Sequence, residues 1–355
     1  MMLRPRCMAT AIGSMPHAEP SAALDLVFSS IPDAPMWPQL SQRALREQME
    51  IQYSEGLPRI VVDDEKGRMF LDTSGDYYED LAAFYEGYMA MEESGDCSAG
   101  AIGPDYAAGI SALEARLQAL SAKPLIVKCQ TTGPISFALT TVDENKRAIY
   151  YNEEFVDVVV KGLAMKCRWQ IQKFRPYAEN VLCFIDEPIL SAFGSSTYVS
   201  VQREDVIAQL SEVVGAVHAE DAIAGIHCCG NTEWSVLVDA GVDIISFDAY
   251  DHGETVALYP EHMKKHLVDR KNALAWGVVP TSAAVRDETS ATLAERFEKL
   301  VDRLANAAGI DKQIIYEQAF VTPSCGTGSM GVPDAERVLE LLRETSTALR
   351  EKHGF

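Results

Sequence analysis

The clearest chemical signal in the sequence is His227-Cys228-Cys229, which follows an apolar run typical of a buried strand. In an extended chain, side chains two positions apart point the same way, so His227 and Cys229 can face one ion while Cys228 faces away. A further thiol, Cys325, follows another apolar run. One imidazole and two thiolates favour zinc and would leave a fourth position open for a substrate, as in catalytic zinc sites. These residues therefore predict a zinc site, the alternative being that they are ordinary buried side chains.

The remaining cysteines are not part of a comparable metal-binding motif. Eight cysteines in a chain of this length, without a secretion signal, indicate reduced thiols and metal ligands rather than a disulfide framework. We expect five of them to be small buried hydrophobic side chains: Cys7, Cys97, Cys129, Cys167 and Cys183.

Two acids follow the apolar run Val181–Ile185. Asp186 and Glu187 stand where the chain would leave a sheet, and either could bind a substrate ammonium or act as a general base. The alternative is a helix N-terminus that accommodates negative charge. After an earlier apolar run, Gly13-Ser14 offers backbone N–H groups and a hydroxyl that could hold a carboxylate, although a simple turn would look the same.

Short apolar runs alternate with stretches of helical period along the chain, which is typical of parallel strands joined by crossover helices. Eight such strands predict an α/β fold, a (β/α)8 TIM barrel, in which catalytic groups follow the carboxyl ends of the strands. The predicted strands are Ala9–Gly13, Met36–Leu40, Leu125–Gln130, Val181–Ile185, Ala222–Ile226, Asp243–Phe247, Ala273–Val278 and Ile314–Val321.

Helix signals fall between these strands. Asn152 and Ser290 can each cap an amphipathic run, and Pro333 suits the first turn of a last helix. The stretch 55–124 is too long for one crossover, and we interpret it as an insertion: a hairpin of Arg59–Asp63 and Met69–Asp72, then helices. Since no repeat or linker divides the chain, we expect one barrel domain over residues 1–355.

Composition excludes several classes of protein. The chain has 355 residues, 47% of them hydrophobic, and a formal net charge of −21. This charge would repel a nucleic-acid backbone or an anionic membrane surface. No apolar run reaches the length of a membrane span and no signal peptide opens the chain, so we expect a cytoplasmic protein.

Five motifs together resemble the C-terminal catalytic barrel of cobalamin-independent methionine synthase, in its short single-barrel form. This family belongs to the superfamily that includes uroporphyrinogen decarboxylase and the corrinoid-dependent thiol methyltransferases. The motifs occur in the family's order and span most of the chain: Ile12-Gly13-Ser14-Met15-Pro16, Thr132-Gly133-Pro134, Ile185-Asp186-Glu187-Pro188, His227-Cys228-Cys229-Gly230-Asn231 and Val321-Thr322-Pro323-Ser324-Cys325-Gly326.

The resemblance implies a zinc-dependent methyltransferase that acts on a small-molecule thiol, homocysteine above all. The zinc ligands it implies are His227, Cys229, Asp248 and Cys325. The family acid is usually glutamate, so Asp248 is one methylene shorter, and Asp251 could replace it. The resemblance further implies that Ile12-Gly13-Ser14 holds the carboxylate of the amino acid and that Asp186 holds its ammonium. Zinc would deprotonate the bound thiol, which is the nucleophile for a methyl group.

Two departures from the family concern the methyl donor. The chain has no counterpart of the extra N-terminal barrel that helps to hold the folate donor in full-length relatives. The family's catalytic histidine after the seventh strand is also missing, and Gly277–Thr281 stands in its place. A cob(I)alamin leaving group needs no proton, so both departures favour a methylcorrinoid protein as the donor.

Two other functions stay open. A uroporphyrinogen decarboxylase-like enzyme without metal would need cationic groups for several substrate carboxylates, and the net charge of −21 disfavours it. A non-catalytic zinc- or corrinoid-binding accessory protein would carry a saturated structural site with no position for substrate.

Overall fold

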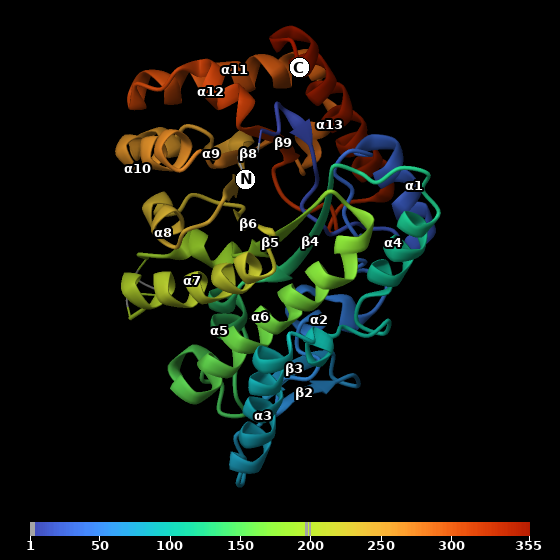
Figure 1. Cartoon of the computed structure of the whole chain (residues 1–355), viewed down its shortest axis with the longest axis vertical. Coiled ribbons are helices and arrows are strands. Elements are labelled where there is room, and N and C mark those ends of the chain that lie inside the picture. Colours follow the sequence, from blue (N-terminus) through green and yellow to red (C-terminus); the bar gives the residue numbers. More distant parts are fainter. Residues whose placement is uncertain (1–3, 196–197, 199) are drawn as a thin grey trace.

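A curled, parallel seven-stranded sheet forms the centre of the computed structural model, which describes residues 4–195, 198 and 200–355 (Figure 1). The strand order is β1-β9-β8-β7-β6-β5-β4, so the first strand pairs with the last. The predicted α/β class with a parallel sheet is confirmed. The strands are β1 Met8–Ala9, β4 Ile126–Thr132, β5 Asn180–Asp186, β6 Ile223–Cys228, β7 Ile244–Phe247, β8 Ala273–Val279 and β9 Ala319–Pro323.

The predicted strand Met36–Leu40 lies between the two edge strands of this sheet but forms only isolated bridges. On one side, the Lys128 N–H of β4 donates to the carbonyl of Pro35, just before the predicted strand, at 2.8 Å. Beyond β1, the Gln39 N–H donates to the Gly13 carbonyl at 3.0 Å. Pro35 and the following Pro38 have no N–H to donate, which explains why no continuous ladder forms.

The start of the last predicted strand, Ile314–Val321, is wrong. Helix α12 occupies Lys312–Glu317, and the side chain of Asp311 caps it by accepting from the Gln313 N–H at 2.9 Å. Strand β9 begins only at Ala319. A short apolar run cannot by itself distinguish a buried helical turn from a strand, and here the cap decides.

Helices cover the outer face of the sheet (Figure 1). Asn152 caps α6 as predicted, whereas α11 is capped by Thr289, one residue before the predicted Ser290, in a capping box with Thr292. No helix in the described ranges is both long and apolar enough to cross a membrane. The longer helices of this layer are α1 Pro20–Ser30, α6 Glu153–Phe174, α7 Arg203–Ala219, α11 Ser290–Ala308 and α13 Val332–His353, and the shorter ones include α5 Pro134–Thr140, α8 Trp234–Asp239, α9 Ala249–His252 and α10 Pro260–Lys264.

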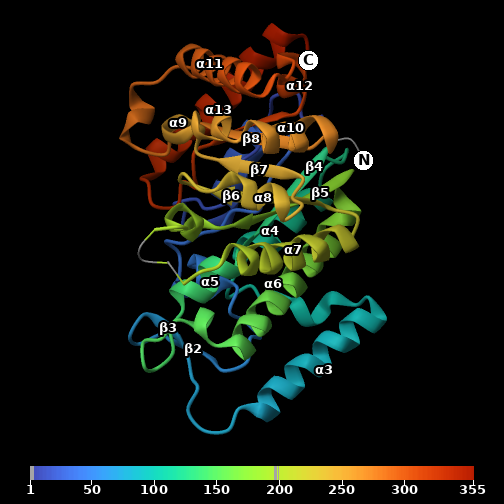
Figure 2. The ribbon, with the colours of Figure 1, turned by 90° about the vertical axis from the view of Figure 1, so that its left-hand side faces the viewer.

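The predicted hairpin is confirmed as β2 Ile60–Asp63 and β3 Arg68–Leu71, an antiparallel pair. Two helices follow, α3 Tyr78–Ser94 and α4 Ala108–Gln118. Figure 2 shows α3 at the edge of the molecule, beyond α6, while α4 lies closer to the sheet.

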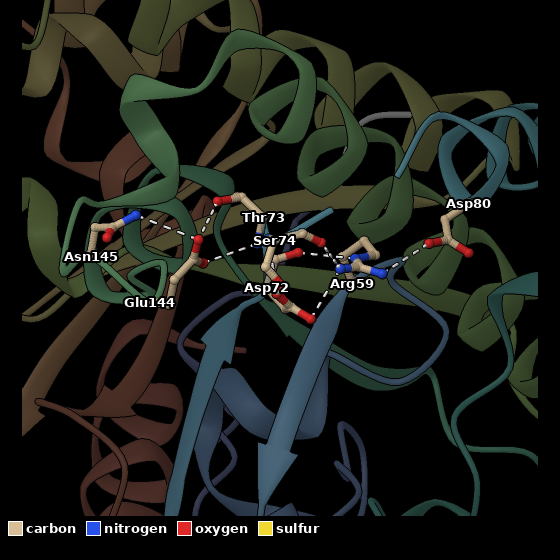
Figure 3. Close-up of polar contacts among 7 residues, drawn as sticks. All are labelled: Arg59, Asp72, Thr73, Ser74, Asp80, Glu144 and Asn145. Atoms are coloured by element: carbon tan, nitrogen blue, oxygen red, sulfur yellow. Dashed lines mark hydrogen bonds and ion pairs between the residues drawn. The ribbon is translucent and has the colours of Figure 1, made fainter. Parts of the chain in front are cut away.

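Polar contacts fix the hairpin to the chain around it (Figure 3). Arg59 donates to the Asp72 carboxylate at 3.0 Å and to the Ser74 carbonyl at 2.7 Å. Glu144, in the loop after α5, accepts from the N–H and the hydroxyl of Thr73 at 3.0 and 2.7 Å. The hairpin is therefore joined to the loop that follows α5.

The two faces of the sheet pack separately. Side chains of the outer face belong to the main core, which continues into the helices. The inner face carries a smaller apolar cluster that includes Ile126, Leu182, Phe184, Ala275 and Phe320. Strand register and alternation place Lys128, Asp186 and His227 on this same inner face. Lys128 pairs with Leu182 of the apolar cluster, whereas Asp186 and His227 pair with each other near the carboxyl ends of their strands.

Candidate metal centre

The structure brings together His227, Cys229 and Cys325, whose ligand atoms all lie within 4.8 Å of one another. His227 lies near the end of β6 and Cys229 follows that strand, while Cys325 follows β9. The carboxyl ends of parallel strands meet at one edge of a sheet, so residues about a hundred positions apart converge there. Cys228 is buried and donates its thiol to the Gly230 carbonyl at 3.6 Å.

The imidazole of His227 has one nitrogen, Nε2, that is free to bind a metal. Its Nδ1 lies 3.0 Å from the Ser246 hydroxyl, and its Nε2 is buried without a hydrogen-bond partner. Burial lowers the pKa of His227 to about 3, so the ring is neutral near pH 7. A neutral imidazole with one oriented and one free nitrogen, next to two thiols, fits a zinc ion.

The two thiols interact with each other. A hydrogen bond from Cys325 lowers the pKa of Cys229 to about 7, and the same contact raises that of Cys325. Both side chains are partly exposed. The pair therefore has one thiol that ionises readily, as a soft metal requires of its ligand.

The predicted fourth ligand, Asp248, lies outside this cluster. Its carboxylate caps α9 by accepting from the Asp251 N–H at 2.9 Å, and burial raises its pKa. Asp251, the predicted substitute, contributes its backbone to this cap. Among the described residues, neither acid belongs to a group of three or more potential metal ligands.

A polar row continues across the inner face beside the cluster. Thr132 pairs with Asp186, Asp186 with His227, and His227 with Ser246 in the register of four adjacent strands. The Thr132 hydroxyl and the Oδ1 atom of Asp186 are buried and have no hydrogen-bond partner in the described part of the chain. Burial raises the pKa of Asp186 to about 8, although the positive charge of Lys128 acts to lower it. This row of residues therefore has polar atoms that are free to bind a ligand at the ends of the strands.

Glu187 is engaged elsewhere. Its carboxylate accepts from the Ile135 N–H at 2.9 Å and from the Ser136 N–H and hydroxyl at 2.8 and 2.7 Å, all at the start of α5. A Cβ atom on Gly133 would overlap this carboxylate. The two predicted acids therefore differ: Asp186 has a free oxygen, and Glu187 matches the helix N-terminus that was the alternative interpretation.

The segment around Gly13-Ser14 packs against the loop that carries Cys325. The Ser14 carbonyl accepts from the N–H and hydroxyl of Thr327 at 2.9 and 3.0 Å, and its hydroxyl accepts from the Gly328 N–H at 3.2 Å. Gly13 has φ +152°, and a Cβ there would lie 2.8 Å from the Gln130 side chain. Within the described residues, the N–H groups of Gly13 and Ser14 donate to no other atom, so both are free for a ligand.

Sequence reasoning missed Lys128, which is fully buried on the inner face. Its ammonium donates to the Ile12 carbonyl and, at 3.0 Å, to Gln130, and lies 4.7 Å from the Phe184 ring centre. A signal was available, because Lys128, Gln130 and Thr132 alternate within a buried strand. Polar residues at every second position indicate that one face of the strand meets something polar.

Comparisons with known proteins give a likeness to solved structures alone, and it is distant. No protein family model matches the chain, and no curated protein matches it. Among solved structures it is similar to a B12-independent methionine synthase from Shewanella sp. W3-18-1 in complex with selenomethionine, with a TM-score of 0.47 and 14% identity over 68% of this chain and 67% of that one. A likeness this distant assigns no activity to the chain.

Proposed function

We propose that the protein is a zinc-dependent methyltransferase that transfers a methyl group to a thiol, with homocysteine as the acceptor and methionine as the product. The observation that carries this proposal is the cluster of His227, Cys229 and Cys325, with a buried and unpartnered imidazole nitrogen aimed at the two thiols. The motif resemblance to the cobalamin-independent methionine synthase barrel supports the same function.

The residues present fit zinc. Two sulfurs and one imidazole nitrogen are a familiar ligand set for a catalytic zinc that keeps one position for substrate. When bound, the metal would lower the pKa of a substrate thiol so that it is a thiolate near pH 7. Asp248 acts on Cys229 through space, and we infer that its carboxylate holds the fourth position until the substrate thiol takes it.

The other residues of the inner rim would orient the acceptor. We infer that the free N–H groups of Gly13 and Ser14 bind the amino-acid carboxylate and that the unpartnered oxygen of Asp186 accepts from its ammonium. Held at both ends, the sulfur is aimed at the methyl donor, and this orientation supplies part of the rate enhancement. In the transfer, the sulfur lone pair forms the new S–C bond, and the bonding pair of the broken bond stays with the donor.

A methylcorrinoid protein is the donor we propose. The segment Gly277–Thr281 stands where the family has a catalytic histidine. Its last residue, Thr281, donates its N–H to the Ser324 hydroxyl at 3.1 Å, and the two hydroxyls lie 3.0 Å apart. Hydroxyl groups are poor acids at neutral pH, so this position suits a leaving group that takes up no proton.

We also infer that the chain is one (β/α)8 domain over residues 1–355, with the insertion around 55–124. The segment 33–39 would supply the eighth strand position, since it is hydrogen-bonded on one side to β4 and on the other to the residues after β1.

Zinc-edge X-ray absorption on the purified protein, with and without homocysteine, tests the function. We expect two sulfur ligands at rest and a third when homocysteine is added. The Cys325→Ser variant should lose one sulfur in both states, and Cys97→Ser, which removes a buried thiol outside the cluster, should lose none. Zinc that does not respond to homocysteine would leave an accessory role, and a protein that binds no zinc would contradict the proposal.

A further inference from the structure

Lys128 is a buried cation with no described counter-charge in contact. It is fully buried. No carboxylate of the described residues lies within ion-pair distance of it, although Asp186 acts on it through space. Burial lowers the pKa of Lys128 to about 8, so it is still mostly protonated at pH 7. An unpaired buried charge is costly, which argues that this lysine has a role in the site on the inner face.

The ammonium is hydrogen-bonded to one particular peptide unit. It donates to the Ile12 carbonyl, and the N–H on the other side of that peptide bond belongs to Gly13. A cation on a carbonyl oxygen withdraws electron density from the peptide, so the N–H becomes a stronger donor. The Gly13 N–H is free in the described structure. Because the peptide is trans, this N–H points away from the Ile12 carbonyl and therefore away from Lys128.

Neighbouring residues hold this peptide in place. Gln130, the second acceptor of Lys128, packs against Gly13 and donates to the Trp37 carbonyl at 3.1 Å. The Tyr53 hydroxyl donates to the Gln130 carbonyl at 2.9 Å. The lysine and the peptide that it contacts therefore belong to one buried hydrogen-bond network.

We propose that Lys128 is a positioning residue that polarises the Ile12–Gly13 peptide, so that the Gly13 N–H binds the carboxylate of an α-amino-acid thiol. This inference rests on the proposed function and adds a source of selectivity to it. The positive charge beneath the peptide favours an anionic group directly, and the polarised N–H adds a directional hydrogen bond. Thiols that lack a carboxylate gain neither contribution.

Calorimetric titration of the zinc-loaded protein with two thiols tests this inference. L-Homocysteine carries the carboxylate, and 3-aminopropane-1-thiol has the same amine and thiol without it. We expect Lys128→Met to weaken L-homocysteine binding at least tenfold and to change 3-aminopropane-1-thiol binding less than twofold. Lys128→Gln can still donate one neutral N–H to Ile12, so its affinity for L-homocysteine should fall less than that of Lys128→Met. It replaces Lys128→Met in the experiment if that variant does not fold.

Lys166→Met is the matched control. Lys166 is also buried and donates to a backbone carbonyl, that of Glu55 at 2.5 Å, but it lies on α6 beside the insertion. This variant should bind both thiols as the wild-type protein does. Equal losses for both thiols, or no loss for either, would overturn the role of Lys128 and leave the proposed function standing. Wild-type protein that binds no L-homocysteine would overturn both.

Discussion

At the scale of single residues, Ser246 decides which nitrogen of His227 is available. Its hydroxyl lies 3.0 Å from Nδ1, which directs the unpartnered Nε2 toward the thiols. Residues that orient a metal ligand in this way commonly change metal affinity by about 10–100-fold when removed. We expect Ser246→Ala to weaken zinc binding by about this factor, measured by competition with a chromogenic chelator.

A control for this variant lies far from the site. Ser346 is buried and donates to the Cys7 carbonyl at 2.7 Å, so Ser346→Ala also removes one buried hydroxyl with one hydrogen bond. Its zinc affinity should equal that of the wild-type protein. Equal losses in the two variants would show that the effect of Ser246 is general destabilisation.

The sequence predicts that three residues of the candidate site come together, but it does not predict the residues that support them. His227, Cys229 and Cys325 carry unusual chemistry and follow apolar runs, so residue type and periodicity are sufficient. Ser246 has an ordinary side chain, and its importance comes from strand register, which pairs it with His227. The residue types of two strands do not show by themselves which residues stand opposite each other.

At the scale of secondary-structure elements, Glu187 ties β5 to the start of α5 through three hydrogen bonds. Removing a buried acceptor leaves donors unsatisfied, at a cost of about 1–3 kcal/mol each. We expect Glu187→Ala to lower the free energy of unfolding by about 2–4 kcal/mol, measured by urea denaturation. Glu144→Ala removes an exposed acceptor of two hydrogen bonds (Figure 3) and should cost about 1 kcal/mol or less.

A histidine links α7 to β7 and makes stability depend on pH. His218 Nε2 lies 2.7 Å from the Asp243 carboxylate, and this hydrogen bond raises the pKa of His218 above 6.5. The protonated form is favoured in the folded state, so its contribution is complete below the unfolded pKa and is lost as pH rises through the folded pKa. From about pH 6 to 8, unfolding free energies from urea titrations should therefore fall for this reason, and His218→Gln should flatten that part of the profile. Parallel profiles for the two proteins would contradict the assignment.

The predicted elements fail where a local feature competes with hydrophobic pattern. Apolar runs identify most strands of the sheet, and the hairpin of β2 and β3 is found as well. Proline interrupts the ladder around Met36–Leu40, and the Asp311 cap turns the start of Ile314–Val321 into a helix. The pattern of apolar residues shows which segments are buried. Helix caps and prolines, which lack an N–H group, decide which secondary structure a buried segment adopts.

At the scale of the whole molecule, the two ends of the chain form one side of the site together. Strand β1 pairs with β9, and Ser14 is bound by Thr327 and Gly328. Contacts of such long sequence separation form late and slowly in folding. The candidate site is therefore complete only when the last strand has joined the first.

The distribution of cysteines gives the protein a built-in chemical readout. Six cysteines are buried, and the two that are partly exposed are Cys229 and Cys325. Thiol reagents modify accessible thiolates, and a bound metal blocks them. We expect an aromatic disulfide reagent to modify Cys229 and Cys325 rapidly in metal-free folded protein and to modify neither of them in zinc-loaded protein. The six buried thiols should react only after denaturation. More than two fast thiols, or a count that ignores zinc, would contradict this. The absorbance of the released thiolate would then report, in any preparation, what fraction of molecules carries metal.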